Sequence, residues 1–260
     1  MAKLALITGA SSGIGYELAK IHAKNGGDVL LVARRLDRLN ALKAELEGAH
    51  KVSVDVLAED LSDEGAAQRI FDHASTLRSP VEFLINNAGF GGRGLFVERD
   101  WASDRDMIQV NIIALSALTR LFLPGMISRQ SGRILNVSSP AGELPGPMQA
   151  VYFASKAFVT SFSLALTEET RGAGVTVTAL LPGATASEFA QTADMEKTPL
   201  FVNAASPKNV AETGYAAMMA GRMKVFAGIP FSRRIIYAFA PFVPIASLMR
   251  SVRKAQETPK

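Results

Sequence analysis

The residues KLALITGASSGIG, from Lys3 to Gly15, decide the fold of this chain. A short apolar run over 3–8 predicts a buried strand, and residues 14–25 predict a helix. A strand, a glycine turn and a helix in this order bind dinucleotide phosphates, because glycine lets the backbone approach the pyrophosphate and the helix N-terminus offers free N–H groups. An ordinary glycine-rich turn is the alternative interpretation. The candidate cofactor-binding residues here are Gly9, Ser11, Ser12, Gly13, Ile14 and Gly15.

The alternation of strand and helix continues along the chain. Further strands are predicted over 28–33, 51–56, 81–86, 132–138, 175–181 and 224–228, and further helices over 36–47, 63–77, 104–129, 150–172 and 207–221. This order is typical of an α/β fold, here a Rossmann-type doubly wound parallel β-sheet with helices on both faces. The 260 residues would accommodate two domains, but no break in the pattern separates them. We therefore predict a single dinucleotide-binding and catalytic domain over 1–229, followed by a basic and apolar extension over 230–260.

Two arginines follow the second predicted strand, where a dinucleotide-binding fold often carries an acidic residue for the ribose of NAD. Arg34 lies 19 residues after Gly15, and Arg35 follows it. A guanidinium group can bind a phosphate through two parallel hydrogen bonds, and the missing carboxylate removes a source of repulsion. The pair therefore indicates a site for a 2′-phosphate and NADP(H) as the cofactor. A basic start to the next helix is the alternative.

A tyrosine and a lysine four residues apart indicate acid–base chemistry. Tyr152 and Lys156 share one face of a predicted helix, and Ser139 precedes Tyr152 by thirteen residues. A free phenol has a pKa of about 10, and a nearby ammonium favours the phenolate. We therefore expect Lys156 to lower the pKa of Tyr152 and to make it a proton donor and acceptor at a carbonyl or alcohol oxygen. The pair alone is weak evidence, since helix surfaces carry such pairs by chance.

The motifs gain specificity from their order along the chain. They are Thr8-Gly9-x-x-x-Gly13-Ile14-Gly15, Asn86-Asn87-Ala88-Gly89, Asn111, Ser139, Tyr152-x-x-x-Lys156 and Pro182-Gly183. In this order and spacing the chain resembles the short-chain dehydrogenase/reductase family, in its branch with TGxxxGIG and YxxxK motifs. The resemblance covers residues 3–229.

The resemblance implies a catalytic role for four residues. Tyr152 would be the general acid/base, and Lys156 would lower its pKa and hold the nicotinamide ribose. Ser139, which fits the family spacing better than its neighbour Ser138, would hydrogen-bond the substrate oxygen. Asn111 would position a water molecule that links Lys156 to solvent. Without the resemblance, Asn111 would be interpreted as an ordinary amide inside a helix.

The resemblance also implies cofactor contacts beyond the glycine turn. Residues beside the fourth strand would line the cofactor, and a pair after the third strand would contact adenine. After the sixth strand, Gly183 would lie near the nicotinamide carboxamide. Ser187 stands where the family often carries Thr, and it keeps the hydroxyl group. The residues implied are Asn87, Ala88 and Gly89, Asp60 and Leu61, and Pro182, Gly183 and Ser187, with Tyr152 and Lys156 shared with catalysis.

The predicted function is that of an NADP(H)-dependent oxidoreductase, which transfers a hydride between nicotinamide and a carbonyl or secondary alcohol. A non-catalytic NADP(H)-binding regulator or scaffold is the alternative, although it would have no need for Asn111, Ser139, Tyr152 and Lys156 together. An epimerase or dehydratase on the same fold is a second alternative, which chain length and the spacing of Ser139 to Tyr152 disfavour. Net change in NADPH absorbance separates a redox enzyme from an epimerase.

Apolar loop residues predict a hydrophobic carbonyl or alcohol as the substrate. The candidate pocket walls are 91–96, 140–148, 184–195 and the C-terminal extension, and residues 188–206 fit a mobile lid. Simple packing of the loops is the alternative. The resemblance implies a homodimer or homotetramer that pairs through the helices 104–129 and 150–172. The apolar wall residues are Phe90, Phe96, Leu144, Met148, Phe189 and Met195.

Composition excludes several classes of site. The chain has no Cys, which excludes disulfides, thiol catalysis and cysteine zinc sites. His22, His50 and His73 lack metal-ligand spacing, so we expect no metal, and we expect His22 to be exposed on its helix. The N-terminus shows neither a charged leader nor a long apolar core, so no signal peptide is expected and the cytoplasm is the predicted location.

The C-terminal extension concentrates positive charge. Residues 222–260 hold eight Lys or Arg and one acidic residue, which gives +7, while the whole chain carries +4. The uncharged run 235–249 contains Pro241 and Pro244 and is too short to span a bilayer, which takes about 20 residues. The run is expected to cover the substrate pocket, to pack in an oligomer interface or to make peripheral membrane contact through 230–254. Nucleic acid is not expected as a partner, because the cations flank an apolar run rather than forming a polar stripe.

Overall fold

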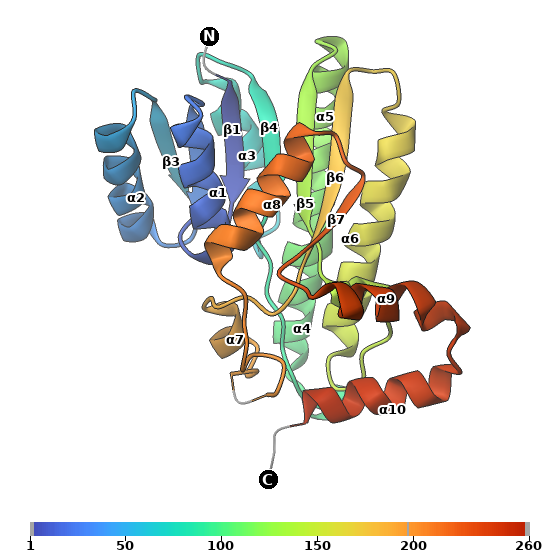
Figure 1. Ribbon diagram of the computed structural model, residues 1–260. Coiled ribbons are helices and arrows are strands. Elements are labelled where there is room, and N and C mark those ends of the chain that lie inside the picture. Colours follow the sequence, from blue (N-terminus) through green and yellow to red (C-terminus); the bar gives the residue numbers. More distant parts are fainter. Residues whose placement is uncertain (1–2, 197, 258–260) are drawn as a thin grey trace.

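The computed structural model describes residues 3–196 and 198–257. Residue 197 of the predicted lid, residues 1 and 2, and residues 258–260 with the predicted tail cation Lys260 lie outside the described residues. Seven parallel strands form one sheet in the order β3-β2-β1-β4-β5-β6-β7 (Figure 1). The strands are β1 (Leu4–Thr8), β2 (Val29–Ala33), β3 (Val54–Ala58), β4 (Val81–Asn86), β5 (Gly132–Val137), β6 (Val175–Pro182) and β7 (Lys224–Ala227).

Helices cover both faces of the sheet, as the predicted Rossmann-type fold requires. One face packs against α1 (Gly13–Lys24), α2 (Leu36–Ala49) and α8 (Pro207–Met219) through buried residues such as Leu18, Leu39 and Val210. The other face packs against α3 (Ala66–Ser75), α5 (Leu115–Ser128) and α6 (Ala150–Glu169). Strands buried on both faces read as continuous apolar runs, which is why the sequence predicts them well. Strand order reverses between β1 and β4, the position where such sheets bind ligands.

The predicted helix over 104–129 is interrupted. Asp100 caps its start by accepting hydrogen bonds from the backbone N–H groups of Ala102 (3.4 Å) and Ser103 (3.0 Å), so α4 begins at Trp101 and runs to Ile108. A π-helical segment, Gln109–Ala114 (η2), then joins α4 to α5. Such segments are frequent at functional sites, and this one contains the candidate residue Asn111.

Two helical stretches are long and apolar enough to cross a membrane by length and composition. They are 101–128, which includes α4 and α5, and α6. Both belong to the layer that covers the sheet, where Leu118, Phe122 and Leu166 are buried against the strands. Packing of a core helix explains their apolar character.

The prediction that His22 is exposed is wrong. His22 is buried, and its ring nitrogens hydrogen-bond the Tyr215 hydroxyl (3.0 Å) and the Lys3 carbonyl oxygen (2.9 Å). Burial lowers the pKa of His22 and favours the neutral ring. Gly27 also lies against this ring, since a Cβ there would stand 2.0 Å from Nε2.

The C-terminal extension forms two helices that the sequence did not predict. They are α9 (Phe231–Phe239) and α10 (Ile245–Gln256), joined by the short segment η4 (Ala240–Phe242). Figure 1 shows them at the carboxyl ends of the strands, at the same end of the molecule as α7 (Phe189–Thr192). Two further short helices, η1 (Phe96–Glu98) and η3 (Pro140–Glu143), lie in the loops after β4 and β5.

Candidate active site

One cavity of about 1060 Å³ lies at the carboxyl ends of the strands. It brings together residues that follow β1, β2, β3, β4, β5 and β6, which is the ligand position expected for an open parallel sheet. Gly15 and Asn111 are the two predicted site residues that do not line it within the described structure. The predicted residues that line it are Gly9, Ser11, Ser12, Gly13, Ile14, Arg34, Arg35, Asp60, Leu61, Asn87, Ala88, Gly89, Ser139, Tyr152, Lys156, Pro182, Gly183 and Ser187.

The glycine turn after β1 presents the N-terminus of α1 to this cavity. Gly13 has φ +59°, and a Cβ at this position would stand 3.1 Å from the Ser187 Cβ. Ser12 precedes α1, but its side chain makes no capping hydrogen bond, so it does not occupy the N–H groups of the first turn. Free N–H groups beside a glycine that keeps the cleft narrow fit a bound phosphate.

Gly15 supports the turn rather than lining the cavity. A Cβ at Gly15 would stand 2.4 Å from the Asn87 side-chain nitrogen and 2.5 Å from the Gly9 carbonyl oxygen. Asn87 in turn donates hydrogen bonds to the carbonyl oxygens of Thr8 (2.9 Å) and Gly9 (3.2 Å). Gly15 thus packs closely where the ends of β1 and β4 meet, and its predicted cofactor contact stays a prediction.

The two arginines after β2 differ in the number of polar groups that their side chains contact. The Arg34 guanidinium lies 3.6 Å from an Asp60 carboxylate oxygen, and its side chain is 75% exposed. Arg35 donates to the hydroxyl groups of Ser11 (3.0 Å) and Ser12 (3.2 Å) and to the Glu188 carboxylate (2.7 Å). Cationic donors thus converge at the end of the cavity beside the glycine turn, where Arg35 already binds one anionic group, the Glu188 carboxylate.

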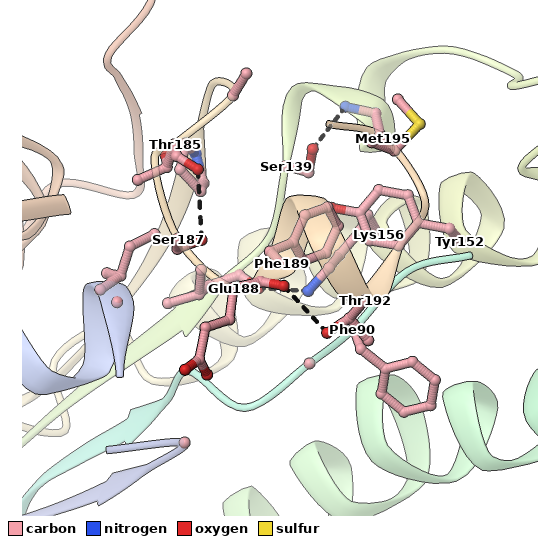
Figure 2. A pocket seen from close by; sticks show the side chains of 18 of the residues that line it. Phe90, Ser139, Tyr152, Lys156, Thr185, Ser187, Glu188, Phe189, Thr192 and Met195 are labelled. Carbon is pink, nitrogen blue, oxygen red and sulfur yellow. Dashed lines mark hydrogen bonds between the residues drawn. The ribbon is translucent and has the colours of Figure 1, made fainter. Parts of the chain in front are cut away.

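The predicted catalytic residues Ser139, Tyr152 and Lys156 gather at the other end of the cavity (Figure 2). Tyr152 and Lys156 come from α6, and the Lys156 Nζ lies 5.9 Å from the centre of the Tyr152 ring. The Lys156 ammonium donates a hydrogen bond to the Val137 carbonyl oxygen (2.9 Å). Ser139 follows β5, and its hydroxyl accepts a hydrogen bond from the backbone N–H of Ala141 (3.1 Å). By contrast, the Ser138 hydroxyl is buried against α6, where it donates to the Lys156 carbonyl oxygen (2.9 Å).

The expectation that Lys156 lowers the pKa of Tyr152 is not met in this structure. Burial raises the pKa of Tyr152 to about 12, and a hydrogen bond with Ser139 acts in the opposite direction. Burial also lowers the pKa of Lys156 to about 8. The ammonium points to the Val137 carbonyl rather than to the phenol, so desolvation dominates both groups. The phenol is therefore protonated at neutral pH.

Asn111 connects the π-helical segment to the loop after β4. Its side-chain oxygen accepts a hydrogen bond from the Phe90 N–H (3.1 Å), and its nitrogen donates to the Phe90 carbonyl (3.0 Å) and the Ser155 hydroxyl (3.0 Å). A Cβ at Gly89 would stand 2.9 Å from the Asn111 side-chain oxygen and 3.1 Å from the Lys156 Nζ. Asn111 and Lys156 therefore lie on the same side of this loop.

Beyond Tyr152 the cavity wall is apolar. The rings of Tyr152 and Phe189 lie 5.4 Å apart, and those of Tyr152 and Phe153 lie 6.2 Å apart. Of the predicted wall residues, Phe96 and Met148 do not line the cavity in the described structure, and Phe96 is exposed on η1. The apolar residues that line it include Phe90, Leu144, Phe153, Phe189, Met195 and Val252.

The C-terminal helix α10 lies in the extension that the sequence analysis offered as a pocket wall, but the residues it contributes were not named there. Val252, Ala255 and Gln256 line the cavity, and Gln256 accepts a hydrogen bond from the side chain of Gln149 (2.5 Å). Gln149 also contacts the Met195 sulfur (3.3 Å), so α10, α6 and the lid segment meet at one point. Val252, Ala255 and Gln256 follow the apolar run 235–249 and stand among the tail cations, so no local pattern shows that they face the cavity. Among residues 3–196 and 198–257, no group of three or more His, Asp or Glu side chains is placed to hold a metal ion.

Comparison with known proteins identifies the family. The short chain dehydrogenase family matches residues 3–198. The chain is 35% identical over 232 residues to a short chain dehydrogenase of Pseudocercospora fijiensis, a match that covers 88% of this chain and 72% of that protein. It is 36% identical over 193 residues to the very-long-chain 3-oxoacyl-CoA reductase of Homo sapiens, covering 72% of this chain but only 61% of that protein.

A solved structure agrees with the sequence relatives. The short-chain dehydrogenase from Sphingobium yanoikuyae in complex with NADPH superposes with a TM-score of 0.83 at 29% identity, and 98% of each chain is covered. The single seven-stranded α/β fold and the sequence relatives thus point to the same family. The chain belongs to the short-chain dehydrogenase/reductase family and is an oxidoreductase of that family.

Proposed function

We propose that the protein is an NADP(H)-dependent carbonyl reductase or alcohol dehydrogenase with Tyr152 as the general acid/base. One observation carries the proposal: a single cavity contains a phosphate-type glycine turn and arginines at one end and a buried Tyr152, Ser139 and Lys156 at the other. The related structure that contains NADPH supports the choice of cofactor.

The residues present fit the proposed cofactor. The α1 N-terminus and Gly13 would hold the pyrophosphate, Arg34 and Arg35 the 2′-phosphate, and Lys156 the nicotinamide ribose. Asp60 and Leu61 would border the adenine, Asn87, Ala88 and Gly89 the middle of the cofactor, and Pro182, Gly183 and Ser187 its nicotinamide half. When bound, the cofactor supplies or accepts the hydride.

The protein supplies the proton and the position of the substrate oxygen. A protonated Tyr152 phenol donates to the carbonyl oxygen in the reductive direction, and the Ser139 hydroxyl orients the same oxygen. Lys156, as a cation, stabilises the phenolate that this transfer leaves behind. Asn111 lies near Gly89 on the same side as Lys156. It would hold the water molecule that links Lys156 to solvent, from which Tyr152 regains its proton.

We further propose an apolar substrate. Leu144, Phe153 and Phe189 pack with Tyr152, α10 adds Val252 to this cluster, and Phe90 lines the same cavity. The name of the human relative describes a substrate with a very long acyl chain. NADPH oxidation with a panel of apolar ketones, aldehydes and 3-oxoacyl thioesters tests the function; turnover of a polar sugar ketone but of none of these would contradict the apolar assignment.

We also propose that the protein is a homodimer or homotetramer. Ile113, Ile127 and Phe158 are exposed on the segment 101–128 and on α6, the elements expected to pair. Large exposed apolar side chains on neighbouring helices are typical of interfaces. Analytical ultracentrifugation should show a dimer or tetramer at micromolar concentration, and a sedimenting monomer would contradict this proposal.

We propose, third, that this protein is cytoplasmic and binds anionic membranes through the corner between α9 and α10. Phe242 is 82% exposed there, beside the exposed side chains of Phe239, Val243 and Ile245. The cations Arg233, Arg234, Arg250, Arg253 and Lys254 flank these residues along the two helices. Self-association of this corner is disfavoured, because a two-fold interface would bring identical positive patches together. Apolar side chains between cations suit an anionic lipid surface.

A vesicle experiment tests the docking corner. Replacing both Phe242 and Ile245 by Ser should abolish co-sedimentation with phosphatidylserine vesicles and leave NADPH binding unchanged, since neither residue lines the cavity in the described structure. The matched control replaces Val97 and Trp101, exposed apolar residues on η1 and α4 rather than on α9 or α10, by Ser and should retain vesicle binding. No binding of the wild-type protein to these vesicles would refute the proposal.

A further inference from the structure

The lid segment is tied to the nucleotide end of the cavity through Glu188, a residue that the sequence did not single out. Its carboxylate accepts hydrogen bonds from Arg35 Nη2 (2.7 Å) and Arg35 Nη1 (3.2 Å), and from Arg38. The ion pairs join residues about 150 positions apart in the chain. Figure 2 shows the Glu188 side chain extending away from Tyr152 and Ser139.

The neighbours of Glu188 connect this contact to both ends of the site. Ser187 lies against Gly13 of the phosphate turn, and Phe189 lies against the ring of Tyr152. The Thr192 hydroxyl donates to the Glu188 carbonyl oxygen (3.1 Å), which fixes the backbone of Glu188 at the start of α7. Glu188 therefore stands between one residue that contacts the glycine turn and another that contacts the ring of Tyr152.

Of the two guanidinium groups that Glu188 engages, that of Arg35 belongs to the site proposed for the 2′-phosphate, and that of Arg38 lies in the same cavity. Arg34, Arg35, Arg38 and Glu188 all line the same cavity. Hydrogen bonds from Arg35 and Arg38 lower the pKa of Glu188 to about 2, so this carboxylate is charged at neutral pH. A carboxylate and a phosphate bind a guanidinium group through the same two-pronged geometry, so they compete for it.

Building on the proposed NADP(H) function, we propose that Glu188 is a specificity-determining residue that acts as an internal competitor of the cofactor's 2′-phosphate. Its carboxylate neutralises Arg35 and Arg38 when the lid lies over the phosphate turn. Binding of the 2′-phosphate draws these arginines away from Glu188 and loosens the lid. Glu188 thereby reduces the advantage of NADP(H) over NAD(H) and couples the cofactor's extra phosphate to the segment that contacts Tyr152.

Two small ligands isolate the contribution of the 2′-phosphate without requiring turnover. Adenosine 2′,5′-bisphosphate carries this phosphate and adenosine 5′-monophosphate lacks it, so the ratio of their dissociation constants by calorimetry measures its contribution. In Glu188→Gln the preference for the bisphosphate should rise about three- to tenfold, which is the range expected for losing a network of partly exposed ion pairs. The gain should shrink as salt is added, because screening weakens exposed charges.

Asp194→Asn is the matched control. Asp194 lies in the same lid segment and pairs with Arg93, a residue that does not line the cavity in the described structure. This variant loses a lid ion pair without touching the phosphate arginines, so its preference should equal that of the wild type. An unchanged or reduced preference in Glu188→Gln would overturn the inference. Failure of the proposed cofactor itself has a different signature, namely a wild-type protein that binds both ligands equally.

Discussion

Tyr152→Phe should lower the turnover of NADPH with an apolar ketone by about 10²–10⁴-fold, the usual contribution of a positioned general acid. The substitution removes only the hydroxyl group, and the remaining ring keeps its contacts with Phe153 and Phe189. Because the pKa of Tyr152 is raised to about 12, the lost group is a protonated donor at the pH of the assay. The dissociation constant of NADPH, measured by its fluorescence, should change little.

Tyr215→Phe is the control for this prediction. Tyr215 is also a buried tyrosine, but its hydroxyl contacts His22 on the far side of the sheet from the catalytic residues and does not line the cavity in the described structure. Its loss should cost about 1 kcal/mol of stability through the broken hydrogen bond and leave turnover intact. Turnover of folded Tyr152→Phe within tenfold of the wild type would remove Tyr152 as the general acid.

The sequence predicts best those elements whose burial leaves a pattern in their own residues. Six of the seven strands begin within one residue of the predicted start, because a strand buried on both faces is apolar throughout. The exception is the edge strand β3, which begins at Val54 rather than at 51. It pairs with β2 alone, and the first paired residues are Val29 and Val54, so its start is set by this partner rather than by its own composition.

Residues whose contacts are made with partners far away in the chain show no recognisable pattern in the sequence around them, so their environment could not be predicted. Glu188 pairs with an arginine 153 positions away, and His22 with a tyrosine 193 positions away. Helices α9 and α10 were missed because prolines interrupt the apolar run, whereas Pro244 in fact precedes α10 directly, where proline is tolerated. The candidate catalytic residues Ser139, Tyr152 and Lys156 could be named from the sequence because their order and spacing carry information that no single residue does.

Arg34→Ala should weaken NADPH binding by about tenfold or more and NADH binding hardly at all, since a hydrogen bond to a charged group contributes about 1.5–3 kcal/mol. Arg35 is already held by Ser11, Ser12 and Glu188, whereas Arg34 has one loose contact with Asp60 at 3.6 Å. Asp60 also accepts hydrogen bonds from the backbone and hydroxyl of Ser62, so it does not depend on Arg34 to stay in place. Arg34 is therefore the cation best able to turn toward an added phosphate.

Arg171→Ala provides the comparison, because the Arg171 side chain is equally exposed, at 75%, and likewise pairs with one carboxylate, that of Glu168. It lies away from the cavity at the end of α6, so both dissociation constants should match those of the wild type. Calorimetric titration of each variant with NADPH and NADH gives the two ratios directly. An equal loss of both cofactors in Arg34→Ala would place Arg34 at a part of the site that the two cofactors share. In that case Arg35 and Arg38 would be left as the cations that distinguish NADPH from NADH. The cofactor preference would then depend on how strongly Glu188 competes with the 2′-phosphate for these two arginines.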